Sequence, residues 1–216
     1  MQNIALLSHH RRGFTLIELL TVMAIIAILA GLTLSISGMV QNKSARTKAE
    51  AEIKTMEAAC ESYKSDNAVY PRGPTPPMPP GAITITGSAT DILNARTDGI
   101  NSQPNRYTDS SLYLYTQLSG DINCNYKYDA DTDGKSYMEF KKDTVSGTKD
   151  ATGTITAVKY LQDPWGNSYG YSTINQVDST KGYNPTFDLW STAGIKDAPK
   201  QPPPDTTITP RWIKNW

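Results

Sequence analysis

The hydrophobic pattern divides the chain into a long apolar stretch, an amphipathic stretch and a mixed, more polar remainder. Within residues 14–40 the only ionisable side chain is Glu18, and residues 19–40 carry no charge at all. As a helix rising about 1.5 Å per residue, residues 19–40 would extend roughly 30 Å. The pattern therefore predicts a helix long enough to cross the hydrocarbon core of a bilayer.

Two ordinary interpretations of the apolar stretch leave Glu18 unexplained. A secretory signal peptide would use Arg11 and Arg12 as its positive end, but its apolar core usually spans only about 7–15 residues. A plain membrane anchor fits the length equally well. Neither has a use for Glu18, and a carboxylate inside hydrocarbon is costly enough to indicate a function and a partner.

Beyond residue 40 the pattern becomes that of an amphipathic helix. Apolar positions recur every three or four residues and form one face: Ala45, Ala49, Ile53, Met56, Cys60 and Tyr63. The opposite face is charged: Lys48, Glu52, Lys54, Glu57, Glu61 and Lys64. A coiled coil could use such a short apolar face, but we expect it to pack against a sheet of the same chain. Tyr70-Pro71 and the prolines that follow predict the end of the helix.

The remainder predicts one α+β domain. Asp109 could cap a short helix that ends at Ser119-Gly120. Four stretches read as strands, because they are rich in β-branched or aromatic residues and flanked by turn residues: 83–86, 137–140, 169–174 and 187–191. Residues 163–167, Asp-Pro-Trp-Gly-Asn, predict a tight turn. The expected fold class is therefore α+β: a long N-terminal helix, half membrane-spanning and half amphipathic, packed on a small antiparallel sheet domain.

Residues 13–20, Gly-Phe-Thr-Leu-Ile-Glu-Leu-Leu, resemble the N-terminal signal of type IV pilins and type II secretion pseudopilins. The resemblance implies that residues 1–13 are a leader that a prepilin peptidase removes between Gly13 and Phe14, and that Phe14 is then N-methylated. It also implies that residues 14–40 remain as membrane anchor and later filament core. Residues 41–70 would then be the amphipathic half of the helix, and residues 71–216 a periplasmic pilin-like domain.

The same resemblance gives Glu18 a partner. Cleavage would free an α-amino group at Phe14 with a pKa of about 8, and therefore a positive charge. Glu18 lies four residues further along the same helical face, where it could neutralise its own chain's amine. The family implies pairing with the amine of a neighbouring subunit. Because a paired charge in hydrocarbon is far less costly than a lone one, such pairing would favour assembly in register.

Two C-terminal segments refine the resemblance. Residues 163–169, Asp-Pro-Trp-Gly-Asn-Ser-Tyr, and residues 187–191, Phe-Asp-Leu-Trp-Ser, are similar to the major pseudopilin of type II secretion. This implies a non-enzymatic structural subunit, anchored once in the inner membrane, of a filament that drives protein export. The implied partners are other pilin or pseudopilin subunits, prepilin peptidase, the inner-membrane assembly platform and membrane lipid. The alternative is a major or minor subunit of a type IV pilus for adhesion, motility or DNA uptake, with an extracellular rather than a periplasmic filament.

Calcium is a possible ligand at two places. The pseudopilins bind it in the loop that follows the Phe-Asp-Leu strand, where Asp197 and Asp205 could be ligands here, although Ile195 stands where the family pattern has an aspartate. Independently, Asp129, Asp131 and Asp133 precede Gly134 with the spacing that opens an EF-hand loop. Position 12 of that loop is Phe140 rather than glutamate, so a solvated acidic loop is the alternative.

Composition narrows the remaining functions. The 21 basic and 21 acidic side chains balance, and no basic stripe indicates nucleic-acid binding. Both histidines, His9 and His10, lie in the expected leader, which removes the usual general base from the mature chain and leaves an aspartate-only hydrolase as the sole enzymatic alternative. Cys60 and Cys124 could form one disulfide in the periplasm, or remain two thiols of which one fills the core.

Overall fold

The structure, a computed structural model, describes residues 14–73, 89–127, 129–196 and 209–216; within the first range the side chains of residues 32–39 are not described. By its internal contacts the chain divides into two compact units, residues 1–44 and residues 45–216. The boundary falls inside helix α1, Leu16–Asn67. Of the four expected strands, residues 83–86 lie outside the described residues.

In the second unit, α1 buries the face that the sequence predicts. Ala49, Ile53, Met56 and Cys60 are buried in the main core, and Tyr63 packs against its margin. Glu52, expected on the charged face, is largely covered, and the hydroxyl of Tyr169 donates a hydrogen bond to its carboxylate. Apolar burial on this one face is what attaches the helix to the rest of the unit.

Helix α1 ends three residues earlier than the Tyr70-Pro71 boundary predicts. It stops at Asn67, and Ala68 has a positive φ of 63° while its N–H donates to the carbonyl oxygen of Lys64 at 2.8 Å. A left-handed residue directly after the last turn is the usual way in which a helix terminates, although glycine takes that position more often than alanine. The backbone therefore leaves the helix before proline can force it to.

Helix α2, Pro104–Ser119, is longer than expected at its N-terminus. Its predicted end is confirmed: Gly120 has a φ of 77° and donates its N–H to Thr116 at 3.1 Å. Its start is not Asp109 but Pro104, which occupies the first turn, where its missing N–H costs nothing. The helix carries buried residues such as Leu114 and Leu118 into the same core as α1.

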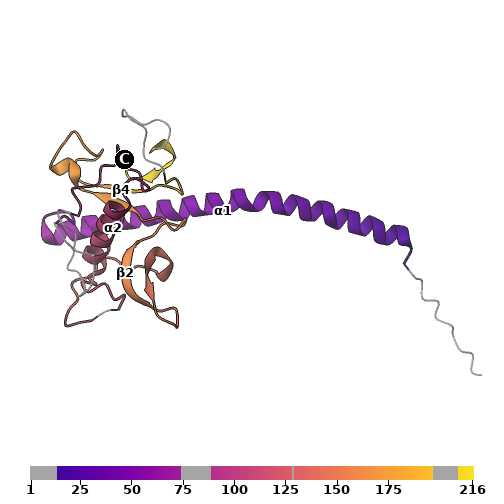
Figure 1. The fold of residues 1–216 in the computed structure, drawn as a ribbon, viewed down its shortest axis with the longest axis horizontal. Coiled ribbons are helices and arrows are strands. Elements are labelled where there is room, and N and C mark those ends of the chain that lie inside the picture. Colours follow the sequence, from indigo (N-terminus) through magenta and orange to yellow (C-terminus); the bar gives the residue numbers. More distant parts are fainter. Residues whose placement is uncertain (1–13, 74–88, 128, 197–208) are drawn as a thin grey trace, which may run out of the picture. The chain divides into compact units, whose positions relative to one another are not determined.

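The strands form two small antiparallel sheets rather than one. In the first, β1 (Val145–Lys149) pairs with β2 (Ile155–Leu161). In the second, the order is β3 (Gly170–Ser172), β4 (Asp188–Ser191) and β5 (Ile213–Lys214). The described residues also contain three short 3₁₀ helices: Lys142–Thr144 before β1, Ile174–Gln176 between β3 and β4, and Thr209–Arg211 before β5. Figure 1 shows α2 and the labelled strands β2 and β4 around the C-terminal part of α1. The α+β class, with a helix packed on antiparallel sheets, is confirmed.

Two strand predictions correspond to β3 and β4, and one is wrong. Residues 137–140 form no strand, because the N–H groups of Tyr137 and Met138 both bond to the carbonyl oxygen of Leu118, at 2.8 and 3.0 Å. This segment thus satisfies the C-terminal end of α2 instead of a neighbouring strand. The β1–β2 hairpin was not predicted, because bulges interrupt its register and its burial does not alternate with a period of two.

A second, smaller aromatic core centres on Trp190 of β4. Its members are Leu93, Ala95, Tyr107, Trp190 and Trp212. Trp190 stacks on Trp212 with ring centroids 6.1 Å apart and donates its indole N–H to the hydroxyl of Tyr107 at 3.0 Å. Gly170, directly opposite in the register of β3, lies under the indole, so a larger residue there would collide with it.

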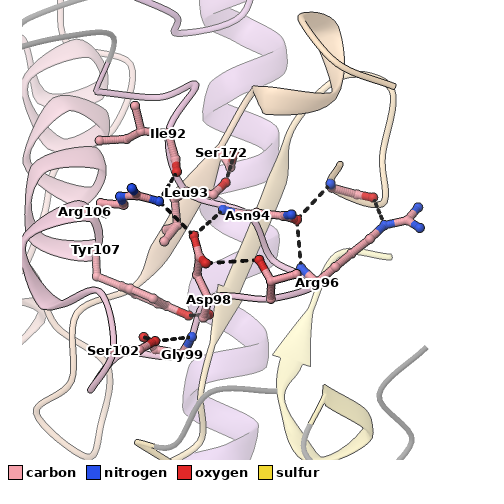
Figure 2. A network of polar contacts seen from close by, with 12 residues as sticks. Ile92, Leu93, Asn94, Arg96, Asp98, Gly99, Ser102, Arg106, Tyr107 and Ser172 are labelled. Carbon is pink, nitrogen blue, oxygen red and sulfur yellow. Dashed lines mark hydrogen bonds and ion pairs between the residues drawn. The ribbon is translucent and has the colours of Figure 1, made fainter. Parts of the chain in front are cut away.

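A network of polar contacts fixes the irregular segment that precedes α2 (Figure 2). The carboxylate of Asp98 accepts hydrogen bonds from the N–H of Asn94 at 3.0 Å and from Arg106 of α2 at 3.4 Å. Its carbonyl oxygen accepts the hydroxyl proton of Tyr107 at 2.9 Å, and Ser102 bonds both to the N–H and to the carbonyl of Gly99. In this segment, side chains supply the hydrogen-bond partners of the backbone that a helix or sheet would otherwise provide.

The possible disulfide is not formed. Cys60 and Cys124 are both free and buried, as in the alternative of two thiols. The carbonyl oxygen of Cys124 accepts the N–H of Val158 at 2.7 Å, which holds the residue against β2. Burial raises the pKa of the Cys124 thiol to about 12 and also raises the pKa of Cys60, so both stay protonated and act as small apolar side chains.

We predict that Gly170→Ala destabilises the second unit by about 1–3 kcal/mol, because the new Cβ would lie 2.2 Å from Cε2 of Trp190. Denaturant unfolding followed by tryptophan fluorescence measures the loss. Gly134→Ala is the matched control, since its Cβ would meet its nearest neighbour, Cδ1 of Ile122, at an ordinary 3.7 Å. Equal stability of the two variants would contradict the close packing of Trp190 on Gly170.

We also predict that both cysteines are reduced in the folded protein. Alkylation in denaturant without any reductant should add two alkyl groups, at Cys60 and Cys124, as measured by intact mass. A protein that takes up the two groups only after reduction would instead contain the disulfide.

Candidate functional site

The start of α1 is the first candidate site, and it is built around one carboxylate. Gly13 lies outside the described residues, Phe14 and Thr15 precede the helix, and Glu18 lies in its first turn. Thr15 is the N-cap, since its carbonyl oxygen accepts the N–H of Leu19 at 3.2 Å. The helix therefore begins immediately after the position where cleavage is expected.

Thr15 and Glu18 form a capping box. The hydroxyl of Thr15 accepts the N–H of Glu18 at 3.3 Å, and the N–H of Thr15 donates to Oε2 of Glu18 at 2.8 Å. The hydroxyl proton of Thr15 also goes to Oε2, at 2.7 Å. These reciprocal bonds satisfy donors that a helix start leaves without partners, and the positive end of the helix dipole favours the negative carboxylate. Both bonds that Thr15 donates use the same oxygen, and a carboxylate has lone pairs for further donors such as an ammonium group.

The helix around this site is apolar on all sides. Phe14 is 86% exposed, and Ile17, Leu20, Ile25 and Ile28 are each more than half exposed. A helix that is apolar all round is normally covered by lipid or by other protein.

No helix among the fully described residues is both long and apolar enough to cross a membrane. The expected span of residues 14–40 includes residues 32–39, whose side chains lie outside that description.

In the acidic loop that could hold calcium, one carboxylate oxygen each of Asp129 and Asp133 is bonded within the loop, while Oδ1 of Asp133 is buried without a hydrogen-bond partner. Oδ2 of Asp129 accepts the amide N–H groups of Asn125 at 2.8 Å and Asn123 at 3.3 Å, and Oδ2 of Asp133 accepts the N–H of Asp129 at 2.6 Å. Asp131 is exposed. Within the described parts of the chain, no three acidic, histidine or cysteine side chains come together as a metal cage. Calcium binding at this loop therefore stays a prediction.

The second calcium candidate lies mostly outside the described residues. The loop begins at Thr192 with a turn in which Ala193 and Gly194 both have positive φ, of 51° and 82°. Asp197 and Asp205 are outside the described residues, so no ligand geometry is available for them. Their role in calcium binding also stays a prediction.

The two C-terminal motifs meet in the structure. Asp163 opens the expected turn: its carbonyl oxygen accepts the N–H of Gly166 at 2.8 Å, and its carboxylate accepts the N–H groups of Trp165 and Asn167. Its other carboxylate oxygen accepts the hydroxyl proton of Ser191 on β4 at 2.5 Å. Burial raises the pKa of Asp163, while these donors partly oppose that shift. The hydrogen bond between Ser191 and Asp163 therefore connects the turn at residues 163–167 to strand β4.

Sequence reasoning missed the role of Thr15, although the Thr-x-x-Glu spacing at residues 15–18 is itself the signature of a capping box. It also missed the network around Asp98. Most partners in that network are near in sequence but follow no capping or turn motif, and the bond from Gly182 to the side chain of Asn94 joins segments 88 residues apart.

Comparison with known proteins finds one family model and several relatives that are similar to part of the chain. Residues 8–34 match the family model described as the prokaryotic N-terminal methylation motif. The chain is 38% identical over 63 residues to the type II secretion system core protein G of Pectobacterium carotovorum subsp. carotovorum. It is 36% identical over 61 residues to the protein of that name in Klebsiella pneumoniae, and 39% identical over 61 residues to the one in Escherichia coli (strain K12).

These similarities cover only part of each protein. The matched segments span 28–29% of this chain and 40%, 44% and 42% of the three relatives in the order given. No solved structure matches the chain. The resemblance to pilins and pseudopilins, and to the G-type protein among them, is nevertheless confirmed by the motif and by these relatives.

We predict that Thr15→Val frays the first turn of α1, because the variant keeps the shape of the side chain but removes the hydroxyl of the capping box. Loss of an N-cap costs about 1 kcal/mol, so amide exchange at residues 17–19 of the full chain in detergent should accelerate about fivefold. Thr21→Val is the matched control, since Thr21 bonds only to the carbonyl of Glu18. Equal exchange rates in the two variants would show that the box does not hold the helix start.

Proposed function

We propose that this chain, whose N-terminal segment is that of the pilin and pseudopilin family, is a structural subunit of a type II secretion pseudopilus. In this role the subunit is processed by prepilin peptidase and assembles through its N-terminal helix into a filament that drives protein export. The observation that carries the proposal is a single carboxylate, Glu18, held in the first turn of an otherwise apolar helix.

Processing supplies the missing partner of that carboxylate. Cleavage between Gly13 and Phe14 creates an α-amino group next to Thr15, and methylation of that amine leaves its positive charge in place. The capping box holds the carboxylate of Glu18 at the same end of the helix as the new amine. The geometry supports an ion pair that exists only after processing.

The pairing partner in a filament is the amine of a neighbouring subunit. An apolar helix such as residues 14–31 is stable either in lipid or against the same segment of other subunits. When the helix moves from the membrane into a filament, its apolar side chains exchange contacts with lipid for contacts with other helices. Burial of apolar side chains alone therefore does not fix the position of a subunit along the filament axis. A charge pair does, because a subunit displaced along the axis leaves both Glu18 and the amine of Phe14 unpaired in a medium of low dielectric constant.

Membrane attachment follows from the same segment. The relatives are core proteins of a secretion system, and the apolar surface around Glu18 supports anchoring in the inner membrane. We place residues 14–40 across that membrane once, with residues 71–216 in the periplasm. Its partners would be further subunits, the assembly platform and lipid, and its work is mechanical rather than catalytic.

A subunit of a type IV pilus is the second candidate. The methylation motif is common to both filaments, but the three relatives carry the name of a type II secretion protein. The hydrogen bond from Ser191 to Asp163 connects the two C-terminal motifs that resemble the secretion pseudopilin. Deleting the gene in its host separates the candidates: loss of protein export with surface filaments intact supports the pseudopilus, and the reverse supports the pilus.

We predict that Glu18→Ala enters the membrane and is cleaved normally but is largely lost from filaments, by about tenfold or more when it competes with the unaltered subunit. Membrane fractionation, N-terminal mass and quantitative mass spectrometry of sheared filaments measure the three steps. Glu139→Ala is the control, since Glu139 is an exposed glutamate of the second unit. Normal incorporation of Glu18→Ala would contradict the role given to the carboxylate.

A further inference from the structure

One end of the second unit gathers basic residues from three separate segments of the chain. The unit begins at Ala45, and the first turn of α1 inside it carries Arg46 and Lys48. Two later segments, residues 141–144 and 209–211, form hydrogen bonds with these two side chains. Each of the later segments brings further basic residues to the same turn. The sequence alone does not reveal this group, because two of its members lie 165 positions apart.

The first of these contacts is formed by Lys48. Its ammonium group donates to the carboxylate of Asp143 and lies 3.7 Å from a carboxylate oxygen of Glu52. The hydrogen bond from Lys48, and more weakly the charge of Lys141, lower the pKa of Asp143 from its ordinary value. Asp143 therefore stays ionised, with Lys141 near it. Lys141 and Lys142 themselves are exposed.

The second contact is formed by Arg46. Its guanidinium group donates to the backbone carbonyl oxygen of Arg211 at 3.0 Å, which brings two positively charged residues together. Arg211 is exposed and Arg46 is partly exposed. Because the acceptor is a carbonyl oxygen and not a carboxylate, this bond neutralises neither charge.

The charges at this end do not balance. Four basic residues, called here the basic end, form no ion pair within the described parts of the chain: Arg46, Lys141, Lys142 and Arg211. Lys48 together with its two carboxylate partners carries one negative charge, and the exposed Glu50 carries another. Four cations against these two negative charges leave a net charge of about +2 around one turn of α1.

The chain itself fixes how far this turn can lie from a membrane anchor. Arg46 comes six residues after residue 40, the end of the expected span, and six residues of helix rise about 9 Å. The headgroup layer on each side of a bilayer is about 5–8 Å thick. Physiological salt screens charges over about 8 Å. A subunit anchored through residues 14–40 therefore keeps the basic end within electrostatic reach of the lipid headgroups.

We propose that the basic end binds the phosphate groups of anionic phospholipids at the surface of the membrane that anchors the chain. This inference rests on the membrane attachment proposed above and adds a second contact with lipid to it. Anionic lipid matches the basic end in charge and in position, and each Lys or Arg near such a surface strengthens the attraction by about fivefold. The contact orients the second unit on the membrane before assembly and is lost when the subunit leaves the bilayer.

The test uses the full chain, labelled with ¹⁵N, in lipid nanodiscs that contain a small fraction of lipid whose headgroup chelates gadolinium. Paramagnetic broadening of the amide signals of residues 142–144 and 211–213 measures how closely the basic end approaches the headgroups. Discs of phosphatidylcholine mixed with phosphatidylglycerol should broaden these signals at least about threefold more than discs of phosphatidylcholine alone. Sodium chloride at about 0.5 M should remove the difference. With one chain per disc, no second copy is present to supply the negative charge.

Two double variants make the test specific. Lys141→Gln with Lys142→Gln should lose most of the additional broadening. Lys64→Gln with Lys135→Gln is the matched control and should behave as the unaltered chain does, because Lys64 lies in the last turn of α1 and Lys135 pairs with Asp66 of that turn. Equal broadening in the two kinds of disc, or additional broadening that persists in the variant of Lys141 and Lys142, would overturn the lipid contact.

Insertion is measured separately, by co-purification of the chain with the discs. A chain that enters both kinds of disc and shows equal broadening keeps the proposed anchor and overturns the lipid contact. A chain that enters neither contradicts the anchor. In that case flotation of the chain with phosphatidylglycerol vesicles at low salt, lost in the variant of Lys141 and Lys142, still supports the basic end, and absence of flotation overturns it.

Discussion

A carboxylate in an apolar environment has a high free-energy cost unless it is paired. Glu18 is the one ionisable group in residues 14–40, and the capping box with Thr15 reduces its cost by supplying two donors to one oxygen. That local arrangement also keeps the charge at the end of the helix, where the dipole favours it. Any partner that completes the neutralisation must therefore reach this same end, and the amine that the proposed cleavage before Phe14 would expose is such a group.

The second unit follows a different rule, since its helix is held by apolar burial rather than by charge. Ile53 and Met56 of α1 pack into one core with α2 and both sheets, and Trp190 organises another on the opposite side of β4. The polar network around Asp98 then fixes the segment that supplies Leu93 and Ala95 to the second core. This division lets one continuous helix serve two environments: one part is uniformly apolar, and the other is apolar on one face only.

The spacing of apolar residues and the turn residues predicted those parts of the structure whose conformation depends on one short segment of the chain. The buried face of α1 could be read directly, because its apolar spacing is that of a helix, and Gly120 marked the end of α2 by its permitted positive φ. The β1–β2 hairpin could not be read, because bulges break its alternation. Residues 137–140 were wrongly predicted as a strand, because two of their N–H groups bond to the C-terminal end of α2 instead of to a neighbouring strand.

The candidate functional residues also differ in how far the sequence alone predicts them. The roles expected for Gly13, Phe14 and Glu18 rest on the motif of residues 13–20, and the capping role of Thr15 could have been predicted from its spacing to Glu18. Acidic spacing at residues 129–133 says nothing of the amide groups of Asn123 and Asn125 that bond to Oδ2 of Asp129, so calcium binding there stays a prediction.

The most direct test of the account is a structure of the assembled filament by cryo-electron microscopy, in which the position of the mature N-terminus is measured. The account predicts that the α-amino nitrogen of Phe14 lies within about 4 Å of a Glu18 carboxylate oxygen of a neighbouring subunit, the distance of an ion pair. A filament in which every Glu18 contacts only its own Thr15, with the amine of Phe14 directed elsewhere, would contradict it.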